Sequence, residues 1–274
     1  MEIKKKNVLF VIGNSIAVLA TIIVNSLAVI LPLNGKSTSE LSDAIPNLFV
    51  PAGITFSIWG IIYLFLIVFM LYQLLSLIKK EKGDMTYLEK IGGWFILASV
   101  ANVLWIFLWH YEYVTFSLFA MLLLFASLLM SYLRLHIGLT TVSFREKIAV
   151  QVPISIYLGW ITVATIANVT AVLVKLGVGE FFLGQVTWTI LVIAVATLIT
   201  ILMLIRRGDI LYSLVIIWAF LGIMIKRLNA DPIYGVQTGI ATTVAIAILI
   251  ILIVLLVKLI PMIQKKRPAV KPES

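Results

Sequence analysis

The chain alternates long hydrophobic runs with short polar connections. A helix needs about 20 apolar residues to cross the hydrocarbon core of a bilayer, and eight runs reach or approach that length. Gly, Pro, Asn and Asp residues, which end helices, punctuate the connections. The predicted spans are residues 8–32, 51–78, 92–110, 113–135, 147–174, 183–205, 210–226 and 238–262. We predict an all-α protein of eight transmembrane helices, in which the short seventh run is the weakest.

Composition supports the same class of protein. The chain is 62% hydrophobic and 12% charged, whereas soluble domains carry roughly 25% charged residues. We therefore expect an integral membrane protein. The absence of cysteine excludes disulfides, thiol chemistry and thiolate metal sites. The net charge of +9 does not indicate nucleic acid, because no soluble basic module is present to bind it.

The distribution of Lys and Arg predicts the orientation in the membrane. Of the 21 Lys and Arg residues, all but Lys36, Lys175, Lys226 and Arg227 fall on the side of the N-terminus if the eight spans are correct. Cytoplasmic connections carry such an excess, so we expect both termini in the cytoplasm. The first run exceeds the 7–15 apolar residues typical of a signal peptide and is expected to be retained. We favour a bacterial plasma membrane, with an organelle membrane as the alternative.

Polar and aromatic residues share helix faces in four of the spans. A polar side chain in hydrocarbon needs a partner or a cavity, so these positions are informative. At spacings of three, four, seven or eight residues lie Asn14, Thr21 and Asn25; Trp59 and Tyr63; Asn102, Trp105 and Trp109; and Tyr157, Trp160 and Asn168. Most of them fall in the outer half of the bilayer, where they predict a ligand cavity under an outer loop.

Two simpler interpretations stand beside the cavity. Trp side chains gather at membrane interfaces, and Trp94, Trp109, Trp188 and Trp218 are expected to form such a belt. Asn side chains in spans often join neighbouring helices by hydrogen bonds. On spacing alone these interpretations are as well supported as a pocket, although Trp59 and Trp160 lie deeper than a belt requires.

Three motifs resemble those of one known family. PAGITFSIWGIIY begins the second predicted span at Pro51, ANVLW contains Asn102 and Trp105, and YLGWITVATIAN runs from Tyr157. Their order and internal spacing are similar to the signatures of helices 2, 3 and 5 in the TspO/MBR family. These are the tryptophan-rich sensory proteins, which include the mitochondrial translocator protein. The resemblance covers residues 8–175, the first five predicted spans.

The resemblance implies a five-helix bundle that binds porphyrins, sterols or synthetic aromatic ligands beneath the connection between helices 1 and 2. Here that connection is residues 33–53. Carried over by motif, the ligand-binding residues are Trp59, Tyr63, Asn102, Trp105, Tyr157 and Trp160. In one departure, Asn47, Leu48 and Phe49 stand where the family has a Trp-rich stretch, so aromatics that could stack on a flat macrocycle are missing.

The resemblance also suggests a division of the chain. We expect a TspO-like bundle in residues 1–178, three additional helices in 179–264, and a basic cytoplasmic tail in 265–274. The added helices have no counterpart in five-helix members. Supporting an oligomer such as a homodimer, extending the pocket, and forming a second half of the protein are three roles left open.

The expected function is binding, and either translocation or sensing, of a hydrophobic aromatic molecule that is porphyrin- or sterol-like. The expected partners are this ligand and the lipid bilayer. The alternative is an ion-coupled secondary transporter, but such proteins usually carry an intramembrane carboxylate or His, and Glu112 and His110 lie at an outer turn. We expect no cofactor, no metal ion and no catalytic residue. Porphyrin breakdown, linked to some family members, is the enzymatic alternative.

Overall fold

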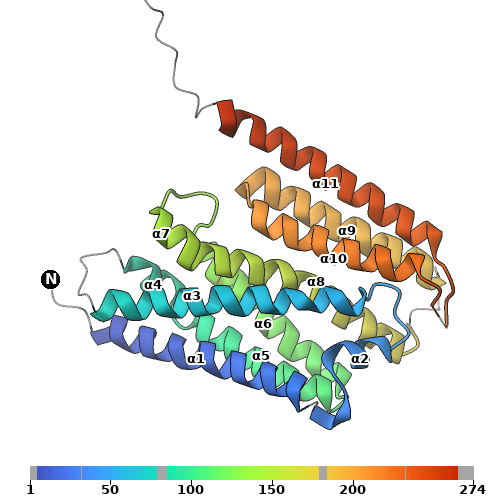
Figure 1. Cartoon of the computed structure of the whole chain (residues 1–274), viewed down its shortest axis with the longest axis horizontal. Helices are drawn as coiled ribbons and strands as arrows, with labels where there is room; N and C mark the ends of the chain where they lie inside the picture. The colour runs from blue at the N-terminus through green and yellow to red at the C-terminus, as the bar shows by residue number, and fades with distance from the viewer. Residues whose placement is uncertain (1–4, 32, 79–84, 179–183, 232, 265–274) are drawn as a thin grey trace, which may run out of the picture.

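The computed structural model describes residues 5–31, 33–78, 85–178, 184–231 and 233–264. Long helices dominate these residues (Figure 1). They are α1 (Lys5–Ile30), α3 (Ile58–Ile78), α5 (Trp94–His110), α6 (Val114–Arg134), α8 (Val152–Lys175), α9 (Gly184–Arg207), α10 (Ile210–Leu228) and α11 (Thr238–Gln264). Shorter elements are η1 (Leu33–Gly35), α2 (Thr38–Asp43), η2 (Gly53–Ser57), α4 (Thr86–Ile91), α7 (Phe144–Glu146) and the π-helical η3 (Lys147–Gln151).

The predicted class of all-α membrane protein is confirmed. Within the residues that the structure describes, seven helices are long and apolar enough to cross a membrane, and α5 is a shorter apolar helix of 17 residues. The third predicted span begins too early at residue 92, because Gly92 adopts a φ of 56° and separates α4 from α5. The predicted basic tail 265–274 and the loop lysines Lys79, Lys80 and Lys82 lie outside the described residues.

Five helices form a ring. Going around it, α1 contacts α5, α5 contacts α6, α6 contacts α8, α8 contacts α3, and α3 returns to α1. In α1, the predicted polar face is confirmed: Asn14, Thr21 and Asn25 are all buried. Asn14 donates to Gln73 Oε1 at 2.9 Å, so these amides join helices of the ring.

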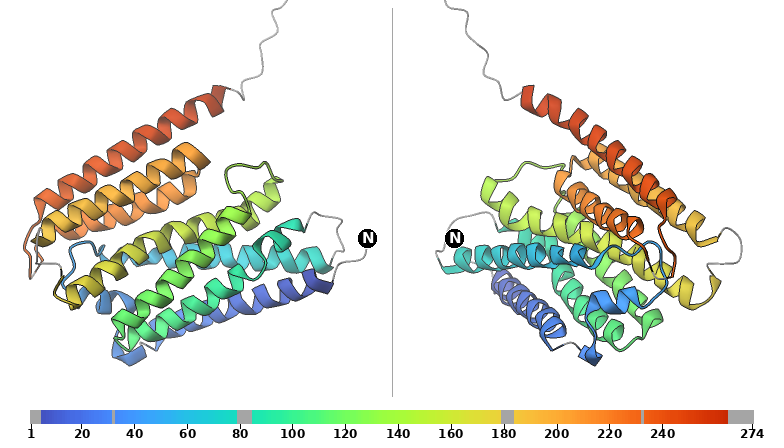
Figure 2. Two further views of the ribbon diagram at one scale, coloured as in Figure 1. Left: turned by 180° about the vertical axis from the view of Figure 1, so that it is seen from behind. Right: turned by 45° about the vertical axis from the view of Figure 1, so that its right-hand side comes forward.

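The last three helices lie beside this ring as a second layer (Figure 2). α10 packs on α8, while α9 and α11 pack on α10 and on each other; we call them the α9–α11 unit. Gly159 permits the close approach of α10, since a Cβ there would stand 3.1 Å from the carbonyl oxygen of Tyr212. The predicted boundary after residue 178 falls between α8 and α9, and the division into domains stays a prediction.

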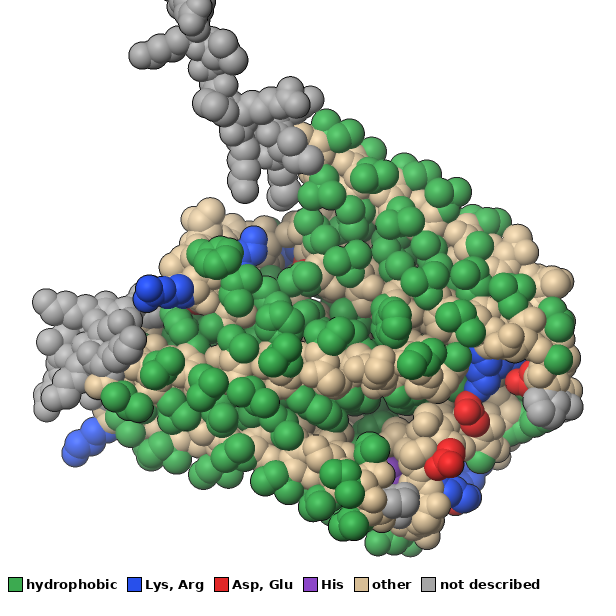
Figure 3. Space-filling model, in the orientation of Figure 1, with side chains coloured by type: hydrophobic (Ala, Val, Ile, Leu, Met, Phe, Trp, Pro, Cys, Tyr) green, Lys and Arg blue, Asp and Glu red, His purple; other side chains and the backbone are tan. Residues whose placement is uncertain are grey.

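The two ends of the molecule differ in their charges (Figure 3). The basic end holds the first turn of α1 together with the α9–α10 connection. At the opposite end, which we call the cap end, residues 33–57 form the cap. The four cations that the sequence places there are engaged: Lys36 pairs with Glu112, Lys226 with Asp43 and Arg227 with Asp231, and Lys175 donates to the Glu112 carbonyl oxygen.

Candidate ligand-binding site at the cap end

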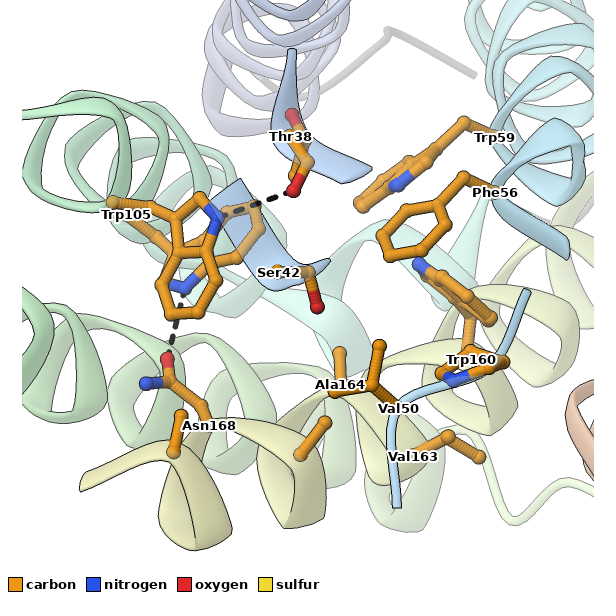
Figure 4. Close-up of a pocket in the computed structure, with 14 residues that line it drawn as sticks. Thr38, Ser42, Val50, Phe56, Trp59, Trp105, Trp160, Val163, Ala164 and Asn168 are labelled. Carbon is orange, nitrogen blue, oxygen red and sulfur yellow. Dashed lines mark hydrogen bonds between the residues drawn. The ribbon is translucent and has the colours of Figure 1, made fainter. Parts of the chain in front are cut away.

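A small cavity lies beneath the cap, between α3, α5 and α8 (Figure 4). Its volume is about 40 Å³. Its lining is Thr38 and Ser42 of α2, Val50, Pro51 and Phe56 of the cap, Trp59 of α3, Trp105 and Trp109 of α5, and Val163, Ala164, Ala167, Asn168, Ala171 and Trp160 of α8. Aromatic side chains from three helices of the five-helix ring therefore surround this cavity.

The rings form two groups on opposite sides of the cavity (Figure 4). On one side Trp59 meets Trp160 edge-on with ring centroids 6.3 Å apart, and Phe56 meets Trp160 edge-on at 5.7 Å. On the other side Trp105 and Trp109 stack at 5.8 Å. Both geometries are the favourable ones for aromatic pairs.

Hydrogen bonds hold the second group of rings in place. Trp105 Nε1 donates to Asn168 Oδ1 at 3.0 Å, and Asn168 is in turn bonded to the Ser117 hydroxyl. Trp109 Nε1 donates to the Thr38 carbonyl oxygen at 3.4 Å. Trp160 differs, because it is only 3% exposed and its Nε1 finds no partner among the described residues. A buried indole N–H without an acceptor is costly, so this atom is available to a ligand.

The cap is fastened to the ring by its own polar groups. Asn47, which stands in place of the Trp-rich stretch, donates to Thr170 Oγ1 at 2.8 Å and to the Ala167 carbonyl oxygen at 3.3 Å. In α2, the Ser37 backbone N–H donates to the Glu40 carboxylate at 2.7 Å. This bond and the Ser37 hydroxyl hold the pKa of Glu40 below its ordinary value. These hydrogen bonds thus hold the cap in place over the cavity.

A larger opening of about 390 Å³ adjoins the cavity between α1 and α3. Phe56, Trp59 and Thr38 line both spaces, so they form the wall between them. The remaining lining is Asn25, Ser26, Val29 and Ile30 of α1, Ser37 and Ser39 of the cap, and Tyr63 of α3. Phe56 and Trp59 are only half-buried, and the helices on either side of the opening expose apolar side chains outward.

The six predicted site residues take up three kinds of position. Trp59, Trp105 and Trp160 line the cavity, and Tyr63 lines the opening, where it stacks on Trp59 at 5.5 Å. Asn102 and Tyr157 are fully buried behind these residues and line neither space. Asn102 Oδ1 accepts from Asn25 Nδ2 at 2.6 Å, and Tyr157 meets Trp59 edge-on at 5.9 Å.

Sequence reasoning missed several lining residues. The interpretation of Trp109 as an interfacial belt residue is wrong, because it is 6% exposed and lines the cavity; its spacing from Asn102 and Trp105 was the correct signal. Phe56 precedes Trp59 by three residues and could have been found by the same periodicity. Thr38 and Ser42 reach the cavity only because α2 folds over it, which no local pattern indicates.

A separate apolar groove lies on the other face of α8. It has a volume of about 370 Å³ between α8 and α9, and Trp188 is the aromatic residue in its lining. Trp188 was predicted as a belt residue and is 40% exposed. This groove provides a control position for locating a ligand.

The charged groups lie away from the cavity. The acidic residues that the structure describes all fall in turns, short helices or helix caps, outside the long helices. Within the same residues, no group of three or more His, Asp or Glu side chains is placed to hold a metal ion. The cavity therefore offers aromatic faces, hydroxyls and N–H groups.

Comparison with known proteins places the chain in a broader context. Residues 10–259 match the family described as TSPO-like protein. No curated protein and no solved structure matches the chain. The match continues into α11, so it includes the α9–α11 unit as well as the five-helix ring.

Proposed function

The chain belongs to the TSPO-like protein family, and from that premise we propose that it binds a hydrophobic, aromatic small molecule at the cap end. The observation that carries this proposal is the convergence of Trp59, Trp105 and Trp160 from three helices on one space beneath an ordered cap. Aromatic walls with a few polar groups are typical of small-molecule sites.

The polar groups of the site define the ligand further. Trp160 Nε1 is a buried donor without a partner, so a ligand with a carbonyl or carboxylate oxygen near its aromatic system would satisfy it. Flat ring systems would stack on indole faces, where each pair contributes about 0.5–1.5 kcal/mol beyond burial. Porphyrin-like and smaller aromatic ligands share this chemistry.

The sizes of the two spaces indicate how a ligand would enter. The cavity of about 40 Å³ is well below the ~300 Å³ of small ligand pockets, whereas the adjoining opening of about 390 Å³ is within that range. We propose that the ligand arrives from the bilayer between α1 and α3 and displaces Phe56 and Trp59, which joins the two spaces. With cytoplasmic termini, this opening faces the outer leaflet.

Ion-coupled transport is less well supported. A coupled transporter usually carries a carboxylate or His within its spans. The described acidic residues lie outside the long helices, and His110 is the last residue of α5, at the cap end. Translocation and sensing both begin with ligand binding, so binding is the property to test first.

The test uses the full chain in lipid nanodiscs, titrated with protoporphyrin IX and with the smaller aromatic probe 1-aminoanthracene. Bound probe is measured by equilibrium dialysis, so that removing a tryptophan does not alter the signal. We expect Trp59→Leu and Trp160→Leu to weaken binding about tenfold, as the loss of ring contacts and a hydrogen bond predicts.

Trp188→Leu is the matched control, because Trp188 lines the α8–α9 groove instead of the cavity. It should leave the affinity unchanged. Loss of binding in Trp188→Leu with retention in Trp160→Leu would place the probe in the groove. The absence of saturable binding to the unaltered chain would contradict the proposed function.

A further inference from the structure

At the cap end, α10 is hydrogen-bonded to the segment that forms part of the wall of the site. Ala52 N–H donates to the Gly222 carbonyl oxygen at 3.0 Å, and Trp218 Nε1 donates to the Thr55 carbonyl oxygen at 3.0 Å. Residues 218, 222 and 226 are four apart, so they lie on one face of α10. Lys226, the third of them, pairs with Asp43 at the end of α2. We call this face the cap clamp.

Close packing accompanies these bonds. A Cβ built on Gly222 would stand 1.9 Å from Thr55 Oγ1 and 2.9 Å from Thr55 Cβ. Thr55 is only 1% exposed, so it has little room to move away. Glycine at position 222 is therefore required for the observed approach of α10 to the cap.

The cap clamp and the cavity contact different residues of one short segment. Within residues 50–57, Ala52 and Thr55 contact α10, whereas Pro51 and Phe56 line the cavity. Phe56 is also part of the wall between the cavity and the opening. No residue of α10 lines either space, so α10 reaches the site indirectly, and residues 50–57 are the part of the wall to which it is hydrogen-bonded.

We propose that the α9–α11 unit is a positioning element for the ligand site, and that Trp218 and Gly222 set the position of Phe56 and thereby the access from the opening to the cavity. The inference rests on the proposed function and assigns a role to the three added helices. In a bare five-helix ring, residues 50–57 would lack these contacts and the wall would move more freely.

The test compares clamp variants with a matched variant elsewhere on α10. Gly222→Ala displaces Thr55 while favouring the helix itself, and the milder Trp218→Phe removes one N–H donor. Tyr212→Phe is the control, since Tyr212 donates to Thr162 Oγ1 at 3.0 Å in the same α8–α10 interface without touching the cap. All three are studied as full chains in nanodiscs.

Two measurements distinguish the movement of the wall from the access of the ligand to the cavity. Hydrogen–deuterium exchange of residues 50–57 reports the wall itself, and the dissociation rate of bound 1-aminoanthracene reports access. For the clamp variants we expect exchange and dissociation to be about fivefold faster, as the loss of one hydrogen bond predicts. Tyr212→Phe should change neither.

Each outcome decides between these ideas. Equal acceleration in Tyr212→Phe, or unchanged exchange in folded Gly222→Ala and Trp218→Phe, would overturn the positioning role. Selective acceleration of exchange in a chain that binds no probe would leave α10 as the clamp of the cap while the proposed function fails.

Discussion

The basic end and the cap end differ in what surrounds their buried polar side chains. At the basic end, Asp209 accepts from Ser155 Oγ at 2.7 Å and from the Tyr212 backbone N–H at 3.1 Å. Phe69 and Phe95 fill the adjacent part of the ring, with centroids 4.8 Å apart. At the cap end, by contrast, aromatic rings surround a cavity, and the N–H of Trp160 has no partner among the described residues.

The difference teaches where to look for function in a membrane bundle. A polar group in hydrocarbon must be satisfied by a partner or by whatever fills a cavity. The pairs at the basic end close that part of the ring. The buried hydroxyls of Tyr87 and Tyr132 at the basic end also have no hydrogen-bond partner among the described residues, but these side chains do not line the cavity, the opening or the groove. Trp160 Nε1 belongs to a residue that lines the cavity, and this marks the cap end as the place where a ligand could complete the structure.

The largest expected effect is at the basic end. Asp209→Ala removes the N-cap of α10 and the acceptor of the buried Ser155 hydroxyl. We expect the free energy of unfolding in detergent to fall by about 3 kcal/mol, while the affinity of the folded fraction for 1-aminoanthracene is unchanged. Asp209→Asn, which keeps a side-chain oxygen, should lose less. A changed affinity in Asp209→Ala would show that the two ends are coupled.

A second variant tests the amide that positions an indole at the cap end. Asn168→Leu removes the acceptor of Trp105 Nε1, so we expect about 2 kcal/mol lower stability together with weaker probe binding. Asn14→Leu is the matched control, because it breaks the Asn14–Gln73 bond at a distance from the cavity. Both variants are compared by chemical unfolding and by dialysis. Equal binding in the two would remove Asn168 from the site.

Variants of the Asn25–Asn102 pair test whether Asn102 contacts the ligand or only joins α1 to α5. Asn102→Leu leaves Asn25 with its bond to the Thr21 carbonyl oxygen, so the loss of stability should be about 1 kcal/mol. If the pair only joins α1 to α5, Asn25→Leu with Asn102→Leu should cost less than the sum of the single changes. A loss of probe affinity in Asn102→Leu that exceeds its loss in Asn25→Leu would favour the predicted ligand contact.

The smallest expected effect is a pH dependence in the stability of α2, in the cap. Bonds from Ser37 hold the pKa of Glu40 below its ordinary value in the folded chain. A carboxyl group whose pKa is lower in the folded chain than in the unfolded chain stabilises the folded chain at pH values above its unfolded pKa. This stabilisation is lost as the pH falls through the folded pKa. We expect exchange of the α2 amides, corrected for intrinsic rates, to accelerate over that acidic range. Glu40→Gln should remove this dependence, and a persistent one would assign it to another group.

Much of the fold could be predicted because its signals are local. Apolar runs predict the membrane helices, and spacings of three, four or seven residues predict which side chains share a face. That periodicity correctly placed Trp59, Trp105 and Trp160 toward the interior, and the same periodicity pointed to Trp109. The cap was harder, since Thr38 and Ser42 reach the cavity through the fold of α2.

The sequence by itself determined the membrane class, the helical segments and the inward faces, because hydropathy and helical periodicity are properties of consecutive residues. Only the tertiary structure decided that Asn102 pairs with Asn25, that Trp160 keeps an unpaired N–H and that α10 holds Thr55. The two contacts join residues 77 and 163 positions apart, and the unpaired N–H depends on what surrounds the Trp160 side chain. Interhelical packing determines these contacts, and the spacing of residues along the sequence does not predict that packing.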